Sequence, residues 1–205
     1  MVSFGGVDEC LQVVGDVGVS HEKASAAQDS GAYDPIVAIK DQDGNSVNTD
    51  EGIRRGTTRE KMGQLKPAFT EDGVIHAGNA SQICDGSAAL LVMSAEKAKK
   101  LGLKPLARVH TAVLAGADPV IMLSAPIPAT QKALRKSGLN IKDIADDKRL
   151  NPNGGAIALG HPPGGSGARI MTTMLYCMRD NGIRFGFQTM CEGGGQANAT
   201  ILELP

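Results

Sequence analysis

Two glycine-rich runs in the last third of the chain constrain its fold most strongly. The first, Gly160-His161-Pro162-Pro163-Gly164-Gly165-Ser166-Gly167, carries a histidine, and the second, Cys191-Glu192-Gly193-Gly194-Gly195, begins with a cysteine about thirty residues later. Glycine lets the backbone turn sharply and approach a ligand closely, so both runs are predicted to be loops. A thiol, a histidine and exposed backbone amides are what acyl transfer needs, because the thiolate requires a base and a developing oxyanion requires donors.

The apolar pattern around these loops predicts alternating helices and strands, which indicates the α/β class. Helices are expected at residues 21–29, 95–101, 128–136 and 168–179. Strands are expected at residues 36–40, 87–93, 106–114, 184–190 and 198–204. Residues 19–82 read as a loop-rich excursion, with Ser20 as the N-cap of its helix.

Composition excludes several classes of function. The 205 residues carry a net charge of −1, with 3% aromatic residues and no Trp, so nothing favours nucleic-acid binding. No apolar run approaches the roughly twenty residues of a membrane span, and the first six residues lack a signal-peptide pattern, so a cytoplasmic protein is expected. The four cysteines lack metal-ligand spacing, and we expect no metal site.

Each candidate site also has a plain structural interpretation. His161 could be a loop histidine bonded to backbone, and Cys191 could be a small buried residue at a strand end. Ala77-Gly78-Asn79-Ala80-Ser81 could admit a long thin ligand or could simply be a tight loop. The cations between Arg54 and Lys66 could be solvated or could bind phosphates. His21 has no partner in sequence and is interpreted as structural.

Four segments together resemble the thiolase family. Asn151 to Pro162 is similar to the thiolase histidine motif, and Cys191 to Gly195 resembles its C-terminal cysteine motif. Gly73 to Leu91 resembles the pantetheine loop and the strand after it, and Asp118 to Thr130 resembles a further loop of the family. The similarity is greatest to degradative 3-ketoacyl-CoA thiolases, which act in fatty-acid β-oxidation and lipid metabolism.

The resemblance implies a thiolase-like layered fold (αβαβα), here incomplete. It implies a remnant of the N-terminal half at 1–18, a loop domain at 19–82, the last strand and helix of that half at 83–104, and a C-terminal thiolase domain at 105–205. It also implies acyl-CoA and coenzyme A as substrates with no bound cofactor. The expected assembly is a homo-oligomer or a pairing with a full-length thiolase.

The resemblance also implies residue roles. His161 would activate the acyl-accepting cysteine, Cys191 would be the acid/base of the second step, and the Gly193 amide would contribute to an oxyanion hole. Ser81 and Ala77 would contact pantetheine, with Leu65 and Phe69 nearby. Met122 would line the acyl pocket.

Two family features have no counterpart in this sequence. These are the nucleophilic cysteine of the N-terminal half and an Asn-Glu-Ala-Phe motif, which would fall between Ile144 and Asn151. We therefore expect a truncated or degenerate acyl-CoA C-acyltransferase polypeptide with little or no activity of its own. Two alternatives stay open: a non-catalytic coenzyme A-binding or thiolase-associating protein, and a cysteine hydrolase built on Cys191 and His161.

Overall fold

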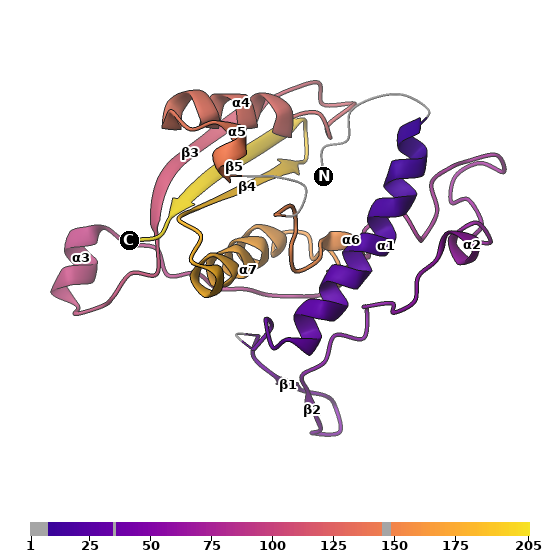
Figure 1. Cartoon of the computed structure of the whole chain (residues 1–205), viewed down its shortest axis with the longest axis horizontal. Helices are drawn as coiled ribbons and strands as arrows, with labels where there is room; N and C mark the ends of the chain where they lie inside the picture. The colour runs from indigo at the N-terminus through magenta and orange to yellow at the C-terminus, as the bar shows by residue number, and fades with distance from the viewer. Residues whose placement is uncertain (1–7, 35, 145–148) are drawn as a thin grey trace. The chain divides into compact units, whose positions relative to one another are not determined.

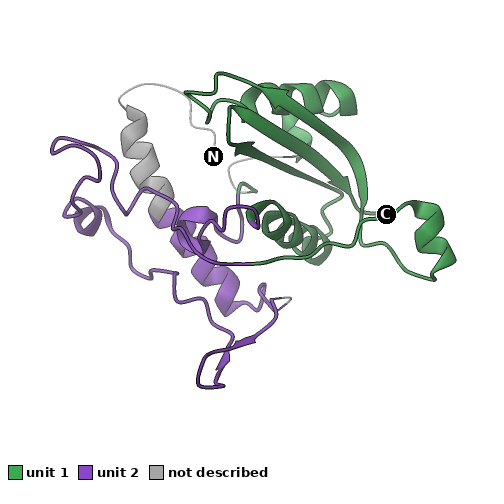
Figure 2. Cartoon of the chain, turned by 180° about the vertical axis from the view of Figure 1, so that it is seen from behind, with its two compact units in different colours: residues 1–2, 87–150, 166–205 green, residues 3–86, 151–165 purple. Residues whose placement is uncertain are grey.

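The computed structural model describes residues 8–34, 36–144 and 149–205, with side chains from residue 18 onward in these ranges. The described chain forms two compact units (Figure 2). Unit 1 contains residues 87–144, 149–150 and 166–205, and unit 2 contains residues 8–34, 36–86 and 151–165. The histidine motif up to Gly165 therefore belongs to unit 2, whereas the cysteine turn belongs to unit 1.

Unit 1 is built on a three-stranded antiparallel sheet. Its strands are β3 (Arg108–Gly116), β4 (Phe185–Glu192) and β5 (Gln196–Glu203), in the order β3-β5-β4. The prediction of strands near 106–114, 184–190 and 198–204 is confirmed within two residues. β4 and β5 form a hairpin in which Cys191 pairs with Ala197, and its turn is the second glycine-rich run.

Helices cover both faces of this sheet (Figure 1). Phe187 of β4 packs with the core under α4 (Pro126–Ser137), whereas Gln188 bonds to Gly167 of α7 (Ser166–Asn181). Successive strand residues point to opposite faces, so α4 and α7 lie on opposite sides of the sheet. Helices predicted at 128–136 and 168–179 are thus confirmed, and Gly138 ends α4 with φ 75°.

The core between α4 and the sheet consists largely of small side chains. The short helix α5 (Ile141–Ile144) follows α4 and contacts β4. Alanines on α4 and on β5 let helix and sheet approach closely, and Ile201 fills the space between them. The buried members of this cluster are Val113, Ala125, Ala129, Ala133, Ala197, Ala199 and Ile201.

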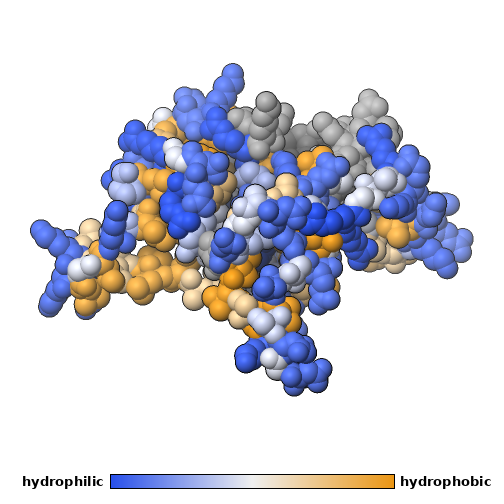
Figure 3. Space-filling model, turned by 60° about the horizontal axis from the view of Figure 1, so that its bottom comes forward, coloured by the Kyte–Doolittle hydropathy of each residue, from blue (hydrophilic) through white to orange (hydrophobic). Residues whose placement is uncertain are grey.

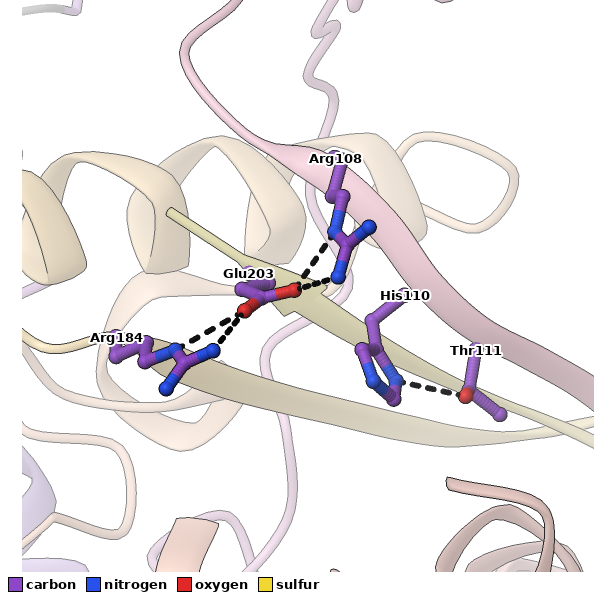
Figure 4. A network of polar contacts seen from close by, with 5 residues as sticks. All are labelled: Arg108, His110, Thr111, Arg184 and Glu203. Atoms are coloured by element: carbon purple, nitrogen blue, oxygen red, sulfur yellow. Dashed lines mark hydrogen bonds and ion pairs between the residues drawn. The ribbon is translucent and has the colours of Figure 1, made fainter. Parts of the chain in front are cut away.

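One buried carboxylate joins the three strands at the C-terminal end of β5 (Figure 4). The Glu203 side chain is 7% exposed, and it accepts hydrogen bonds from Arg108 at 2.7 Å and from Arg184 at 2.7 and 3.0 Å. These bonds, from Arg184 first and then Arg108, hold the pKa of the Glu203 carboxyl below its usual range. His110, also drawn in Figure 4, packs edge-on against Phe185 on the same sheet.

The strand predicted at residues 87–93 is wrong. The structure shows an extended segment outside any sheet, and its Leu91 and Val92 side chains are 80% and 72% exposed. An apolar strand forms only where a neighbouring strand pairs with it. Within the described part of the chain, none does. The helix after it, α3 (Ala95–Lys100), is confirmed, with Ser94 as its N-cap.

Unit 2 contains a long helix and extended loops. Helix α1 spans Asp8–Asp29, so the predicted start near residue 21 is wrong. Ser20 is not its N-cap, because it lies in the interior of α1, where its hydroxyl accepts a hydrogen bond from the Gly155 amide at 3.0 Å. The predicted strand at 36–40 is reduced to β1 (Ile39–Lys40), which pairs with β2 (Ser46–Val47) across the polar turn.

Two further short helices complete unit 2. Helix α2 (Arg59–Met62) and helix α6 (Ala156–Leu159) both contact α1, and Met62 and Ile157 form a small buried cluster. Gly154 lies against α1 so closely that a Cβ there would come within 2.7 Å of the Ala24 Cβ. The first part of the histidine motif is therefore packed directly on α1. Residues 145–148, in the region of the expected missing motif, lie outside the described residues.

Candidate functional site

The histidine loop is held to the chain at residues 82–84. The His161 amide donates to the Gln82 carbonyl at 2.7 Å, and His161 forms a parallel bridge with Ile83. Gly160 has φ 79°, and a Cβ there would lie 2.4 Å from the Cys84 sulfur. Only glycine fits this position, for conformational and for steric reasons. The backbone of His161 is therefore fixed by the contacts of residues 160 and 161 with residues 82–84.

The small-residue loop before that segment is also well ordered by local bonds. The Asn79 side chain accepts from the His76 amide at 2.9 Å and donates to the Val74 carbonyl at 2.7 Å. A Cβ on Gly78 would approach the Leu65 Cδ1 to 2.8 Å, so the loop lies directly against Leu65. Ser81 and Ala77 are both exposed. The segment is thus a tight, locally bonded loop, and contact with a thin ligand there stays a prediction.

Unit 2 contains a pocket of about 200 Å³ beside this loop. Its wall combines cationic groups from residues 54–61 with apolar groups from the small-residue loop and the buried cluster. The lining residues are His21, Arg54, Arg55, Gly56, Thr57, Lys61, Met62, Leu65, Ala77, Gly78, Gln82 and Ile157. Of the predicted pantetheine contacts, Leu65 and Ala77 line this pocket, whereas Ser81 and Phe69 lie outside its lining.

The charge at this pocket is positive. Lys61 donates to the Gly56 carbonyl at 2.8 Å, and Arg55 forms a bidentate pair with Asp29 at 2.6 and 2.8 Å, which lowers the pKa of the Asp29 carboxyl. The Arg54 guanidinium has no hydrogen-bonded or ionic partner among the residues that the structure describes. An arginine of this kind is suited to a phosphate, which it can bind through two parallel N–H donors.

His21 forms the buried side of the pocket. Its side chain is only 5% exposed, and its Nδ1 accepts a hydrogen bond from the Arg54 amide at 3.1 Å. Burial, and then the Arg54 charge, lower the pKa of His21. The neutral ring therefore carries its proton on Nε2. His21 thus holds the backbone of Arg54, the arginine whose guanidinium is unpartnered. The two residues are 33 positions apart, so nothing in the sequence indicates this bond.

The cysteine turn belongs to unit 1. Cys191 ends β4 and is partly buried, and the Glu192 carboxylate accepts a hydrogen bond from the Asn198 side chain across the hairpin. Gly194 and Gly195 have φ values of 77° and 75°. A Cβ on Gly195 would come within 2.6 Å of the Ala117 carbonyl oxygen, whereas one on Gly193 would meet nothing within 4 Å.

Met122 lies in a loop of unit 1 that packs next to this turn. The Ala117 amide donates to the Gly195 carbonyl at 2.8 Å, and the Met122 amide donates to the Asp118 carbonyl at 2.8 Å. Met122 has φ 49°, a left-handed conformation that residues with a Cβ adopt only at a cost. Cys191, Gly193 and Met122 therefore belong to one unit, and His161, Ser81, Ala77, Leu65 and Phe69 to the other.

The described residues contain neither a metal-binding cluster nor a helix able to cross a membrane. No group of three or more His, Cys, Asp and Glu side chains among them could hold a metal ion. No described helix has the length and hydropathy to cross a membrane.

Comparison with known families and proteins gives consistent matches. The family model described as "Thiolase, N-terminal domain" matches residues 18–96, and "Thiolase, C-terminal domain" matches residues 103–146 and 144–204. A 3-ketoacyl-CoA thiolase of Marinobacter nauticus is 42% identical, over 90% of this chain and 55% of its own length. A steroid 3-ketoacyl-CoA thiolase of Mycobacterium tuberculosis is 44% identical, over 90% of this chain and 50% of its own length.

Solved structures of similarly named enzymes match most of this chain. The acetyl-CoA acetyltransferase of Bacillus anthracis superposes with a TM-score of 0.87 at 36% identity, covering 94% of this chain and 56% of the other. Human mitochondrial 3-ketoacyl-CoA thiolase in complex with CoA gives 0.86 at 32% identity, covering 94% and 54%. The expected thiolase-like α/β fold is confirmed, and the chain spans about half the length of the relatives it matches.

Proposed function

This chain belongs to the thiolase family, and we propose that its unit 2 pocket binds coenzyme A for acyl-CoA C-acyl transfer. The observation that carries the proposal is the composition of the pocket wall. Arg54 and Lys61 offer positive charge, with Arg55 already paired to Asp29, and Leu65 and Ala77 offer an apolar surface beside them. Coenzyme A has the matching chemistry, with phosphates at one end and a thin pantetheine arm at the other.

The histidine loop supports the same assignment. His161 lies next to the wall of the pocket, because its backbone amide is bonded to Gln82 and Gln82 lines the pocket. In the proposed reaction His161 takes the proton of an acyl-accepting cysteine, and that cysteine is supplied by the part of the thiolase fold that this chain does not match. The imidazole then helps to bind the thioester oxygen.

The residues of unit 1 are proposed to serve the second half of the reaction. Cys191 moves the proton of the coenzyme A thiol or of the substrate α-carbon, and the Gly193 amide donates to the oxyanion that develops on the thioester. Met122 contacts the acyl chain. The overall reaction is thiolytic cleavage of a 3-ketoacyl-CoA, or the reverse condensation.

A second candidate function is coenzyme A binding without turnover. It is favoured by the length of the match, which covers 50–55% of the two relatives. The resemblance to thiolases implies a nucleophilic cysteine in the half of the fold that has no counterpart in this sequence. Without a nucleophile the covalent step cannot occur. We therefore expect the isolated chain to bind coenzyme A and not to cleave acetoacetyl-CoA.

Calorimetric titration with coenzyme A tests this proposal. Arg54→Gln should weaken binding about tenfold, the loss expected for a charge-assisted phosphate contact. Arg135→Gln, an exposed arginine in the last turn of α4, is the matched control and should leave the affinity unchanged. No heat of binding with folded protein, or equal effects of both substitutions, would contradict the proposed site. A parallel thiolysis assay with acetoacetyl-CoA decides between acyl transfer and binding alone.

A further inference from the structure

The partly buried side chain of Gln82 bonds to two separate segments of unit 2. Its side-chain nitrogen donates to the carbonyls of Gly52 and Ile157, each at 3.1 Å, and lies 3.5 Å from the Ala158 carbonyl. These partners are 30, 75 and 76 residues away in sequence. One carboxamide thus joins the loop before Arg54 to helix α6, which lies within the histidine motif and precedes His161.

The backbone of the same residue contacts the histidine itself. The Gln82 carbonyl accepts the His161 amide at 2.7 Å, and the next residue, Ile83, forms the bridge with His161. The side chain and the main chain of Gln82 therefore hold helix α6 and His161, the residues on both sides of the strained turn at Gly160. Gln82 also lines the pocket, so the same residue borders the ligand site and the histidine loop.

The side-chain bonds are not easily replaced. Helix α6 has four residues, so its carbonyls have no partners within the helix and need donors from elsewhere. The Gln82 carboxamide supplies such a donor to the helix and to Gly52 together. A carboxylate of the same shape supplies none, and it would place a charged oxygen against two carbonyl oxygens.

From these contacts we propose that Gln82 is the positioning residue that sets the His161 loop against the wall of the ligand pocket. The proposal rests on the proposed function in so far as that pocket binds coenzyme A. Gln82 does not touch the reacting atoms. It acts by fixing the distance and orientation between the pocket wall and the histidine backbone, because the side-chain bonds to Gly52 and Ile157 and the main-chain bond to His161 all belong to one residue.

The test uses the full chain and two variants. Gln82→Glu keeps the shape of the side chain and removes its donor, and Gln82→Met removes the hydrogen bonds at similar volume without adding charge. Gln131→Glu, at an exposed position on α4, is the matched control. The readouts are the imidazole resonances of His161, assigned with His161→Gln, and the coenzyme A affinity measured below the melting temperature of each variant.

Both Gln82 variants should shift the His161 resonances and weaken coenzyme A binding about tenfold, whereas Gln131→Glu should do neither. A residue that only stabilises unit 2 would lower the melting temperature and leave both readouts of the folded protein unchanged. That result, or failure of both variants to fold, overturns the positioning role. If the unsubstituted chain does not bind coenzyme A, the proposed function fails, and the His161 resonances still decide whether Gln82 positions the histidine.

Discussion

The environment of Gly160 leaves no space for a side chain. Gly160→Ala places a methyl group 2.4 Å from the Cys84 sulfur on a backbone with φ 79°. We expect unfolding in urea to show a loss of about 2–4 kcal/mol, from overpacking together with left-handed strain. Adding Cys84→Gly removes the contact and should restore all but about 1 kcal/mol of that loss. Equal stability of Gly160→Ala and the unsubstituted chain would contradict the assigned geometry.

His21 makes the folding stability of unit 2 depend on pH in the mildly acidic range. Its pKa in the folded chain lies below its ordinary value of 6.5, with burial as the main cause, so the unfolded chain binds a proton more readily. Stability is therefore full above about pH 6.5 and falls as the pH drops below it. His21→Gln should flatten the melting temperature between pH 7 and pH 5.5, above the range in which the carboxylates titrate. An unchanged slope in this variant would exclude His21 as the cause.

Sequence was informative for residues whose neighbours along the chain define their role. His161 and Cys191 stand out because glycines surround them. Gln82 and His21 do not, because their partners are brought near only by the fold: the Arg54 amide is 33 residues from His21, and the Ile157 carbonyl is 75 residues from Gln82. Glutamine has no chemical signature that marks it as a positioning residue before those contacts are seen.

The β4–β5 turn offers a matched pair of substitutions within one element. Gly195→Ala places a Cβ 2.6 Å from the Ala117 carbonyl oxygen at φ 75°, so it should destabilise unit 1 by about 2–4 kcal/mol. Gly193→Ala has open space around it and should change the free energy of unfolding by less than about 1 kcal/mol. Urea denaturation of the two variants side by side gives the comparison. A reversed order would show that the turn is assigned incorrectly.

Elements were predictable where their stabilising contacts are local or repeat regularly. Helix α4 has Pro near its start and Gly138 after its end, and the hairpin strands flank a glycine turn, so their sequences resemble their structures. The interval 87–93 has the same apolar character, and its conformation depends on a neighbouring strand that sequence cannot provide. Ser20 is not a cap because α1 begins at Asp8, so the serine lies inside the helix and its hydroxyl instead accepts from the Gly155 amide.

The molecule as a whole exposes much apolar surface, which Figure 3 shows as orange atoms on one face. In unit 1, Leu91, Val92, Leu114 and Val120 are each at least 67% exposed. Surface of this kind drives self-association. We expect light scattering to show association at micromolar concentration, and Leu91→Gln with Val92→Gln to reduce it. Val37→Gln, a single exposed valine in unit 2, removes less apolar surface and should reduce it less. A chain that stays monomeric and binds no hydrophobic dye would contradict this expectation.

The proposed coenzyme A site of unit 2 lies next to the histidine loop. Amide resonances of the isotopically labelled chain, followed during titration with coenzyme A, test it most directly. We expect saturable shifts in residues 54–57, 61–65 and 77–82 and at His161, with the α4 and β3 resonances unchanged. Shifts confined to unit 1, or none at saturating coenzyme A, would contradict it.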